Sequence, residues 1–193
     1  LDDIIGQEQL VAPGSILRRR VEAKRLGSIV LFGPPGVGKT SIARAIGTML
    51  GKEFRALHAT RATVKDIRAI ADEAKERPIL IFVDEVHRFS KTQADDLLSI
   101  TEDGLADFIG ATTESPFHSL PKALISRSTI LKLEPLSIED MENVVRRGVD
   151  HLSTQGVNLS LTDAQRQMIA ARSGGDARRA LTAVESLAAG HAQ

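Results

Sequence analysis

The stretch that decides the fold is "SIVLFGPPGVGKT", residues 28–40. Its first five residues form an apolar run that suits a buried strand, and its last eight match the pattern G-x-x-x-x-G-K-[ST] of a phosphate-binding loop. Helical apolar spacing continues over residues 39–50 and stops at Gly51. Because this pattern is meaningful only between a strand and a helix, we interpret the stretch as a true phosphate loop and not a chance match.

The residue types of the loop indicate a magnesium-nucleotide ligand. Gly36 and Gly38 allow backbone N–H groups to turn inward, at a helix N-terminus that favours anions. Lys39 is placed to reach the β- and γ-phosphates, and Thr40 to ligate Mg²⁺. We therefore predict ATP and Mg²⁺ as cofactors, bound by Gly33, Pro34, Pro35, Gly36, Val37, Gly38, Lys39, Thr40 and Ser41.

A second apolar strand, in "ILIFVDEVHR" (79–88), ends at Val83 and is followed by two carboxylates. Ligands of parallel sheets bind at the carboxyl ends of the strands, so Asp84 and Glu85 are predicted to face the phosphates. Asp84 suits Mg²⁺, directly or through water. Glu85, one residue further, suits the polarisation of an attacking water. The alternative is an ordinary solvated strand end.

A third stretch, "FIGATTESPFHSLPKALISRS" (108–128), ends an apolar run on two threonines. If the strand over 105–111 lies beside the other two, Thr113 can hydrogen-bond the phosphate or the attacking water. Thr112 points to the opposite face and is interpreted as structural. Arg127 follows a short helical stretch, and its residue type and position alone favour a surface salt bridge.

The organisation of the chain changes at Pro135. Before it, strands alternate with helices, which predicts an α/β fold with a mainly parallel sheet flanked by helices. After it, only helical patterns occur, over 137–150, 161–173 and 176–190. We predict a nucleotide-binding α/β domain over residues 1–135 and a small all-helical lid domain over residues 136–193.

Composition restricts the function classes. Of the 193 residues, Lys+Arg and Asp+Glu each number 25, which argues against coating of nucleic acid by bulk charge but leaves local patches open. The absence of cysteine excludes disulfides and thiolate metal sites, and the absence of Trp and Tyr disfavours an aromatic platform for single strands. No apolar run approaches the length of a membrane span. Because the chain begins at Leu1 and not at Met, we expect an excerpt of a longer protein.

Six motifs carry a resemblance to a known family. They are "LDDIIGQ" (1–7), "GPPGVGKT" (33–40), "FVDEVHRFSK" (82–91), "EDG" with "FIGATTESPF" (102–117), "ALISRS" (123–128) and "GGDARRAL" (174–181). In this order and spacing the chain resembles an AAA+ ATPase of the clamp-loader clade. Within that clade it is most similar to the replication-associated recombination protein A family, which includes the Werner-helicase-interacting protein. The resemblance covers essentially the whole chain and implies the P-loop NTPase (AAA+) fold with a helical lid.

The resemblance also implies roles for single residues. Lys39 with Thr40 is the Walker A pair, and Asp84 with Glu85 is the Walker B pair. Five further positions follow by matching the motifs: Thr113 as sensor 1, Arg127 as a finger that acts on ATP in the neighbouring subunit, Arg178 as the sensor-2 arginine of the lid, and Ile4 and Ile5 in the segment that holds the adenine.

The activity implied is DNA-dependent hydrolysis of ATP to ADP and phosphate in replication-fork maintenance, recombination and repair. The implied partners are DNA with single-strand/duplex junctions or gaps, other copies of the protein in a homo-oligomer, as a tetramer, and a single-strand-binding protein. The implied location is the cytoplasm, at the nucleoid. A clamp-loader subunit and a RuvB-like branch-migration motor are alternatives. A scaffold that only binds nucleotide is disfavoured, because Lys39, Asp84 and Glu85 are intact.

Two basic groups are candidate contacts to DNA phosphates. One comprises Arg18, Arg19 and Arg20 with Lys24 and Arg25, and the other comprises Arg61, Lys65 and Arg68. The alternative for each is ordinary solvated surface charge. Several copies of a neutral chain would have to add such small patches together to bind DNA.

Overall fold

The computed structural model describes residues 1–191 and divides into two compact units. The first, here called the α/β unit, comprises Leu1–Ile4, Glu8–Gly33 and Lys39–Leu133. The second, the helical unit, comprises Ile5–Gln7, Pro34–Gly38 and the chain from Glu134 onward. The helical unit thus includes two short segments from outside residues 136–193, and one of them is the middle of the phosphate loop.

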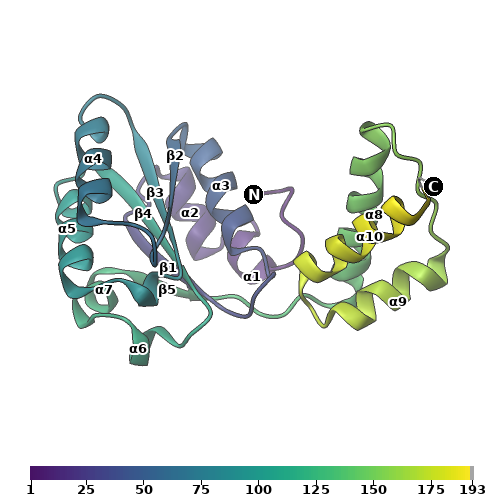
Figure 1. Ribbon diagram of the computed structural model, residues 1–193. Coiled ribbons are helices and arrows are strands. Elements are labelled where there is room, and N and C mark those ends of the chain that lie inside the picture. The colour runs from purple at the N-terminus through teal and green to yellow at the C-terminus, as the bar shows by residue number, and fades with distance from the viewer. Residues whose placement is uncertain (192–193) are drawn as a thin grey trace. The chain divides into compact units, whose positions relative to one another are not determined.

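A five-stranded sheet forms the centre of the α/β unit (Figure 1). Its order is β2-β3-β4-β1-β5, and all four pairings are parallel. The predicted fold class is therefore confirmed. The strands are β1 (Ser28–Phe32), β2 (Glu53–His58), β3 (Ile79–Asp84), β4 (Ala106–Thr112) and β5 (Thr129–Lys132).

Helices cover both faces of the sheet, as a parallel sheet requires. Figure 1 shows α2 (Ile16–Glu22) and α3 (Lys39–Leu50) on one side, with α4 (Val64–Ala74), α5 (Lys91–Glu102) and α7 (Lys122–Arg127) on the other. As a result β3 is buried at every position except Asp84. The short elements α1 (Glu8–Val11), η1 (Val86–Arg88) and α6 (Pro116–Ser119) complete the unit.

The helical unit packs α8 (Ile138–Thr154), α9 (Asp163–Ser173) and α10 (Ala177–His191) around its own core. Ser137 and Thr162 begin α8 and α9 with complete capping boxes, as their sequence pattern predicts. Gly174 ends α9 in the left-handed region, with φ 58°. Within residues 1–191, none of the helices combines the length and the apolar character needed to cross a bilayer.

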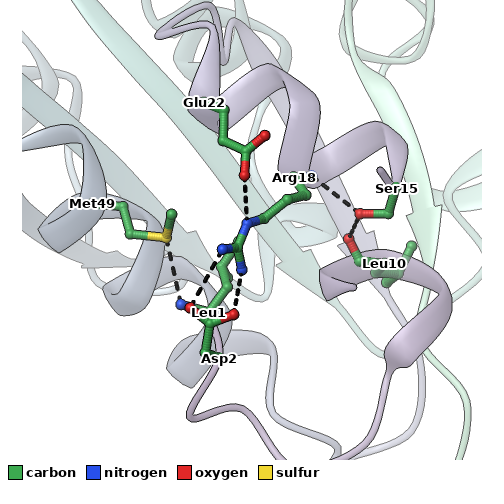
Figure 2. Close-up of polar contacts among 7 residues, drawn as sticks. All are labelled: Leu1, Asp2, Leu10, Ser15, Arg18, Glu22 and Met49. Carbon is green, nitrogen blue, oxygen red and sulfur yellow. Dashed lines mark hydrogen bonds and ion pairs between the residues drawn. The ribbon is translucent and has the colours of Figure 1, made fainter. Parts of the chain in front are cut away.

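The N-terminal segment is joined to α2 by Arg18 (Figure 2). The Arg18 guanidinium bonds both Asp2 (2.8 Å) and Glu22 (2.8 Å), and its side chain is only 13% exposed. The hydrogen bond from Arg18 holds the pKa of Asp2 below its usual value, and the two carboxylates raise the pKa of Arg18. The charge of Arg18 is thus already balanced by two carboxylates, so fewer arginines of the first basic group are available to DNA phosphates than the sequence suggests.

The capping box of α4 gives a prediction about stability and pH. Asp66 accepts hydrogen bonds from the Thr63 hydroxyl (2.7 Å) and the Thr63 backbone N–H (2.7 Å), which lower its pKa from 3.8. A lowered carboxylate pKa stabilises the fold above the unfolded value and is lost as pH falls through the folded value. We expect Asp66→Ala to lower Tm at pH 7 by about 2–4 °C. The difference from wild type should shrink as the pH falls below 3.8.

Thermal melts followed by circular dichroism between pH 7 and pH 3 would measure this effect. Asp72→Ala is the matched control, because Asp72 lies on the same helix in an exposed ion pair with Lys75 that stabilises little. Equal melting temperatures for Asp66→Ala and wild type at pH 7 would contradict the prediction.

Candidate functional site

Three neighbouring strands end at the same edge of the sheet. In register, Phe32 of β1 lies opposite Thr112 of β4, and Val83 of β3 lies opposite Gly110 of β4. One more hydrogen bond extends the ladder beyond the strands, from the Gly33 N–H to the Thr112 carbonyl (3.2 Å). The structure therefore brings the start of the phosphate loop, Thr113 and Asp84 to adjacent strand ends.

The ends of the loop lie in the α/β unit. At Gly33 an added Cβ would lie 2.5 Å from the Leu133 carbonyl oxygen, so only glycine fits where β1 meets β5. Lys39 is the first residue of α3, and its Nζ donates to the Gly33 carbonyl (2.7 Å), closing the loop on itself. Thr40 and the exposed Ser41 follow in the first helical turn, where the positive end of the helix dipole favours phosphate.

The middle of the loop, Pro34–Gly38, lies in the helical unit. Gly36 and Gly38 have φ of 70° and 101°, which side chains rarely adopt. The Gly36 carbonyl accepts from the Ala177 N–H (2.9 Å), and a Cβ at Gly36 would overlap the Asp176 carboxylate. Pro34 and Pro35 are exposed, whereas Val37 is buried. The shape of this segment is thus set mainly by its backbone, and its Val37 side chain packs inward.

The acidic pair sits on a strained turn at the end of β3. Glu85 has left-handed backbone angles, φ 55° and ψ 41°, and its N–H donates to Asp84 Oδ1 (3.0 Å). For a residue with a side chain such a conformation costs on the order of 1–3 kcal/mol, and strain of this kind clusters at functional sites. The conformation turns the chain sharply after Asp84, and the Glu85 side chain is half-buried.

The available donors fit Mg²⁺. The Thr40 hydroxyl and the Asp84 carboxylate are hard oxygen ligands, which Mg²⁺ prefers over nitrogen or sulfur. Two adjacent carboxylates also repel each other unless a cation is near. Thr40 and Asp84 are both partly exposed, so neither is locked inside the core.

The two threonines at the end of β4 have different environments. Thr112 is fully buried, and its Oγ1 bonds His87 Nδ1 (2.8 Å) and the Glu114 N–H (3.0 Å). Thr113 is exposed at the sheet edge. This difference matches the interpretation of Thr112 as structural and leaves Thr113 accessible to a ligand.

Arg127 ends α7 and pairs with Glu102 at the end of α5, Nε to Oε1 at 2.7 Å. Both side chains are about half exposed, at 51% and 52%. Exposed ion pairs of this kind contribute little to stability, so a phosphate could replace Glu102 at small cost. The surface salt bridge expected from residue type is present, and it does not prevent a role toward a neighbouring subunit.

Two of the remaining predicted residues belong to the helical unit. Arg178 is exposed in the first turn of α10, where its N–H donates to Asp176 Oδ1 (2.9 Å). Ile5 packs against the helical core. Ile4 belongs to the α/β unit, where its N–H donates to the Leu1 carbonyl (3.0 Å).

Gln7 has a structural role beside the phosphate loop that the sequence did not predict. It is 5% exposed and has a positive φ of 61°. Its amide donates to the Glu134 carbonyl (2.7 Å) and the Val37 carbonyl (3.3 Å), and it accepts from the Glu134 N–H (3.1 Å). Within the helical unit, Gln7 therefore connects the N-terminal segment to the phosphate loop at Val37 and to Glu134, in the segment that leads into α8. The only sequence signal was its place in "LDDIIGQ".

A glycine-rich loop between a parallel strand and a helix, with an acidic pair two strands away, defines a P-loop nucleotide-binding protein. Residues 29–135, more than half of the chain, match the ATPase family associated with various cellular activities (AAA). The chain belongs to this family of ATPases.

Particular relatives narrow the resemblance. The chain is 44% identical over 190 residues to an AAA domain-containing protein of Mycobacterium tuberculosis, covering 96% of this chain and 42% of that one. It is 42% identical over 188 residues to replication-associated recombination protein A of Bacillus subtilis, covering 96% and 45%. The chain thus spans less than half the length of these relatives. The solved structure of the Thermotoga maritima RuvB Holliday junction branch migration motor matches with TM-score 0.79 and 30% identity, covering 96% and 62%.

The Gln7 contacts give a prediction about folding. Gln7→Ala removes three hydrogen bonds of a buried amide, two of them to the Glu134 backbone, so we expect a loss of about 1–3 kcal/mol in unfolding free energy. Urea unfolding followed by circular dichroism would measure it, since the chain lacks Trp. Gln167→Ala, at an exposed position on α9, is the matched control and should unfold like wild type. An equal midpoint for both variants would contradict the role assigned to Gln7.

Proposed function

We propose that this chain is the motor part of a DNA-dependent ATPase that hydrolyses ATP to ADP and phosphate in replication-fork maintenance, recombination and repair. The observation that carries the proposal is that the start of the phosphate loop, Asp84–Glu85 and Thr113 follow neighbouring strand ends. The name of the Bacillus subtilis relative supports the setting in replication and recombination.

The chemistry assigns a task to each residue. The loop backbone and Lys39 bind the β- and γ-phosphates. Thr40 and Asp84 would hold Mg²⁺, which neutralises phosphate charge when bound. Glu85 takes the proton of the attacking water as its oxygen bonds the γ-phosphorus and the bond to the β–γ bridging oxygen breaks. Thr113 hydrogen-bonds the γ-phosphate or this water.

The proposal includes assembly. Arg127 would contact the γ-phosphate of ATP bound to an adjoining copy, so the full-length protein acts as a homo-oligomer, a tetramer by the family resemblance. Exposed Arg178 on the lid would contact the phosphates when nucleotide binds. A guanidinium at this charge-rich transition state can accelerate hydrolysis by about 10³-fold or more.

DNA would bind through phosphate contacts on several copies. Arg19, Arg20 and Arg25 line a shallow surface depression beside Gly27, and Arg18 is not part of its lining. In the second basic group Arg68 pairs loosely with Asp96 (3.5 Å). We propose single-strand/duplex junctions or gaps as the preferred DNA, a single-strand-binding protein as a further partner, and the cytoplasm, at the nucleoid, as the location.

Two alternatives differ in substrate. A RuvB-like motor on four-way junctions is supported by the structural similarity to RuvB. A clamp-loader subunit would instead pair stably with a sliding clamp. The higher identity to replication-associated recombination protein A, 42% against 30%, favours the proposed function.

The first test is the ATPase rate of the full-length protein with single-stranded, duplex, gapped and four-way DNA. We expect gapped DNA to stimulate hydrolysis most. Glu85→Gln should bind ATP normally and lose about 10²–10⁴-fold in kcat, because it removes the base. Glu76→Gln, at an exposed position, is the control. Equal rates with and without DNA would refute the DNA dependence, and hydrolysis by Glu85→Gln would remove Glu85 from its role.

The second test concerns the action of Arg127 across subunits. Arg127→Ala should bind ATP but hydrolyse it about 10³-fold more slowly in the assembled protein. Mixing it with Lys39→Ala subunits should restore part of the rate, since the intact Arg127 of one variant serves the intact site of the other. Arg146→Ala, an exposed arginine of the helical unit, should change neither rate. Failure of the mixture to regain activity would count against action in trans.

A further inference from the structure

His87 lies at the centre of a set of side-chain contacts that the proposed mechanism does not use. It belongs to η1, directly after the acidic pair, and its side chain is 5% exposed. Its Nδ1 lies 2.8 Å from Thr112 Oγ1. Its Nε2 lies 3.4 Å from Glu85 Oε2 and 3.3 Å from Glu114 Oε1. One ring therefore contacts the expected base, the end of β4 and the loop after it.

The neighbours of the ring determine where its proton lies. Two carboxylate oxygens face Nε2, and a bare lone pair there would be repelled by both, so Nε2 carries the hydrogen. In the neutral ring Nδ1 is then an acceptor, and the Thr112 hydroxyl donates to it. Because Thr112 is fully buried, water cannot substitute for this bond. The carboxylates thus select the ring tautomer with a hydrogen on Nε2, and the Thr112 hydroxyl completes it by donating to Nδ1 at 2.8 Å and not to the more distant Glu114 carbonyl at 3.4 Å.

These contacts connect the phosphate loop to the base. The Gly33 N–H bonds the Thr112 carbonyl, the Thr112 hydroxyl bonds His87, and His87 faces Glu85. The two distances at Nε2 are nearly equal, so Glu85 and Glu114 compete for the same ring nitrogen. Glu114 directly follows Thr113, the residue expected to contact the γ-phosphate. A shift of this loop would change the share of the donor that Glu85 receives.

We propose that His87 is a positioning residue for ATP hydrolysis, which orients the Glu85 carboxylate and couples its orientation to the strand end that carries Thr113. The inference rests on the proposed role of Glu85 as the base. Without the N–H group at Nε2, the partly exposed Glu85 side chain would be free to change rotamer. Its carboxylate would then meet the attacking water in the correct geometry less often. His87 itself touches neither nucleotide nor water in this role.

The test compares steady-state ATPase and ATP binding of the full-length protein with gapped DNA. His87→Leu should lower kcat about 10–100-fold, by analogy with the loss of an outer partner that orients a metal ligand. Its KM for ATP should stay near the wild-type value, because the phosphate contacts remain. His87→Gln keeps an N–H donor and should recover part of kcat.

Thr112→Val, which has the same shape without the hydroxyl, should also lower kcat, by a smaller factor. His118→Leu, at an exposed position on α6, should match wild type.

The outcomes separate the inference from the proposed function. If His87→Leu melts like wild type and keeps its kcat, or if His87→Gln is as impaired as His87→Leu, the positioning role is wrong. If His87→Leu does not fold, Thr112→Val decides, and a wild-type kcat there refutes the inference. Inactive Glu85→Gln beside fully active His87 variants refutes this inference alone. An active Glu85→Gln refutes the proposed function itself.

Discussion

One backbone hydrogen bond, from the Gly33 N–H to the Thr112 carbonyl, sets the geometry on which the site depends. It continues the pairing of β1 with β4 beyond the last strand residues, so the chain leaves the sheet at a fixed point. On the other side, the Leu133 carbonyl approaches so closely that only glycine is tolerated. With β4 between β1 and β3, backbone pairing holds the acidic pair and the start of the phosphate loop at the same edge of the sheet.

The polar side chains around the sheet are of two kinds: buried ones held by hydrogen bonds, and exposed ones that can change partners. Thr112 and His87 are buried and bonded, and they belong to the rigid part. Thr113 is exposed at the same edge. At the opposite edge of the sheet, just before β5 begins, Arg127 pairs with a solvent-exposed carboxylate. A site built in this way has a rigid framework, while its exposed groups can still exchange partners.

The sequence predicted the regular elements well and the contacts between distant segments poorly. Strand β1 and helix α3 match their predicted ranges because a motif and a terminal glycine mark both ends. The short α1, η1 and α6 carry too few residues for a periodic pattern. The contacts of His87 could not be predicted, since they require β4 to pair with β3 and Glu85 to adopt a left-handed backbone. The same holds for Gln7, whose partners are 30 and 127 residues away.

The left-handed backbone at Glu85 has an evolutionary consequence. Glycine would relax that conformation, and asparagine tolerates it better than glutamate does. A laboratory selection for heat resistance alone would therefore enrich such replacements at position 85 and discard the carboxylate. Backbone stability and retention of the proposed base therefore oppose each other at this one residue, so a stabilised variant of the protein would have to gain its extra stability elsewhere in the chain.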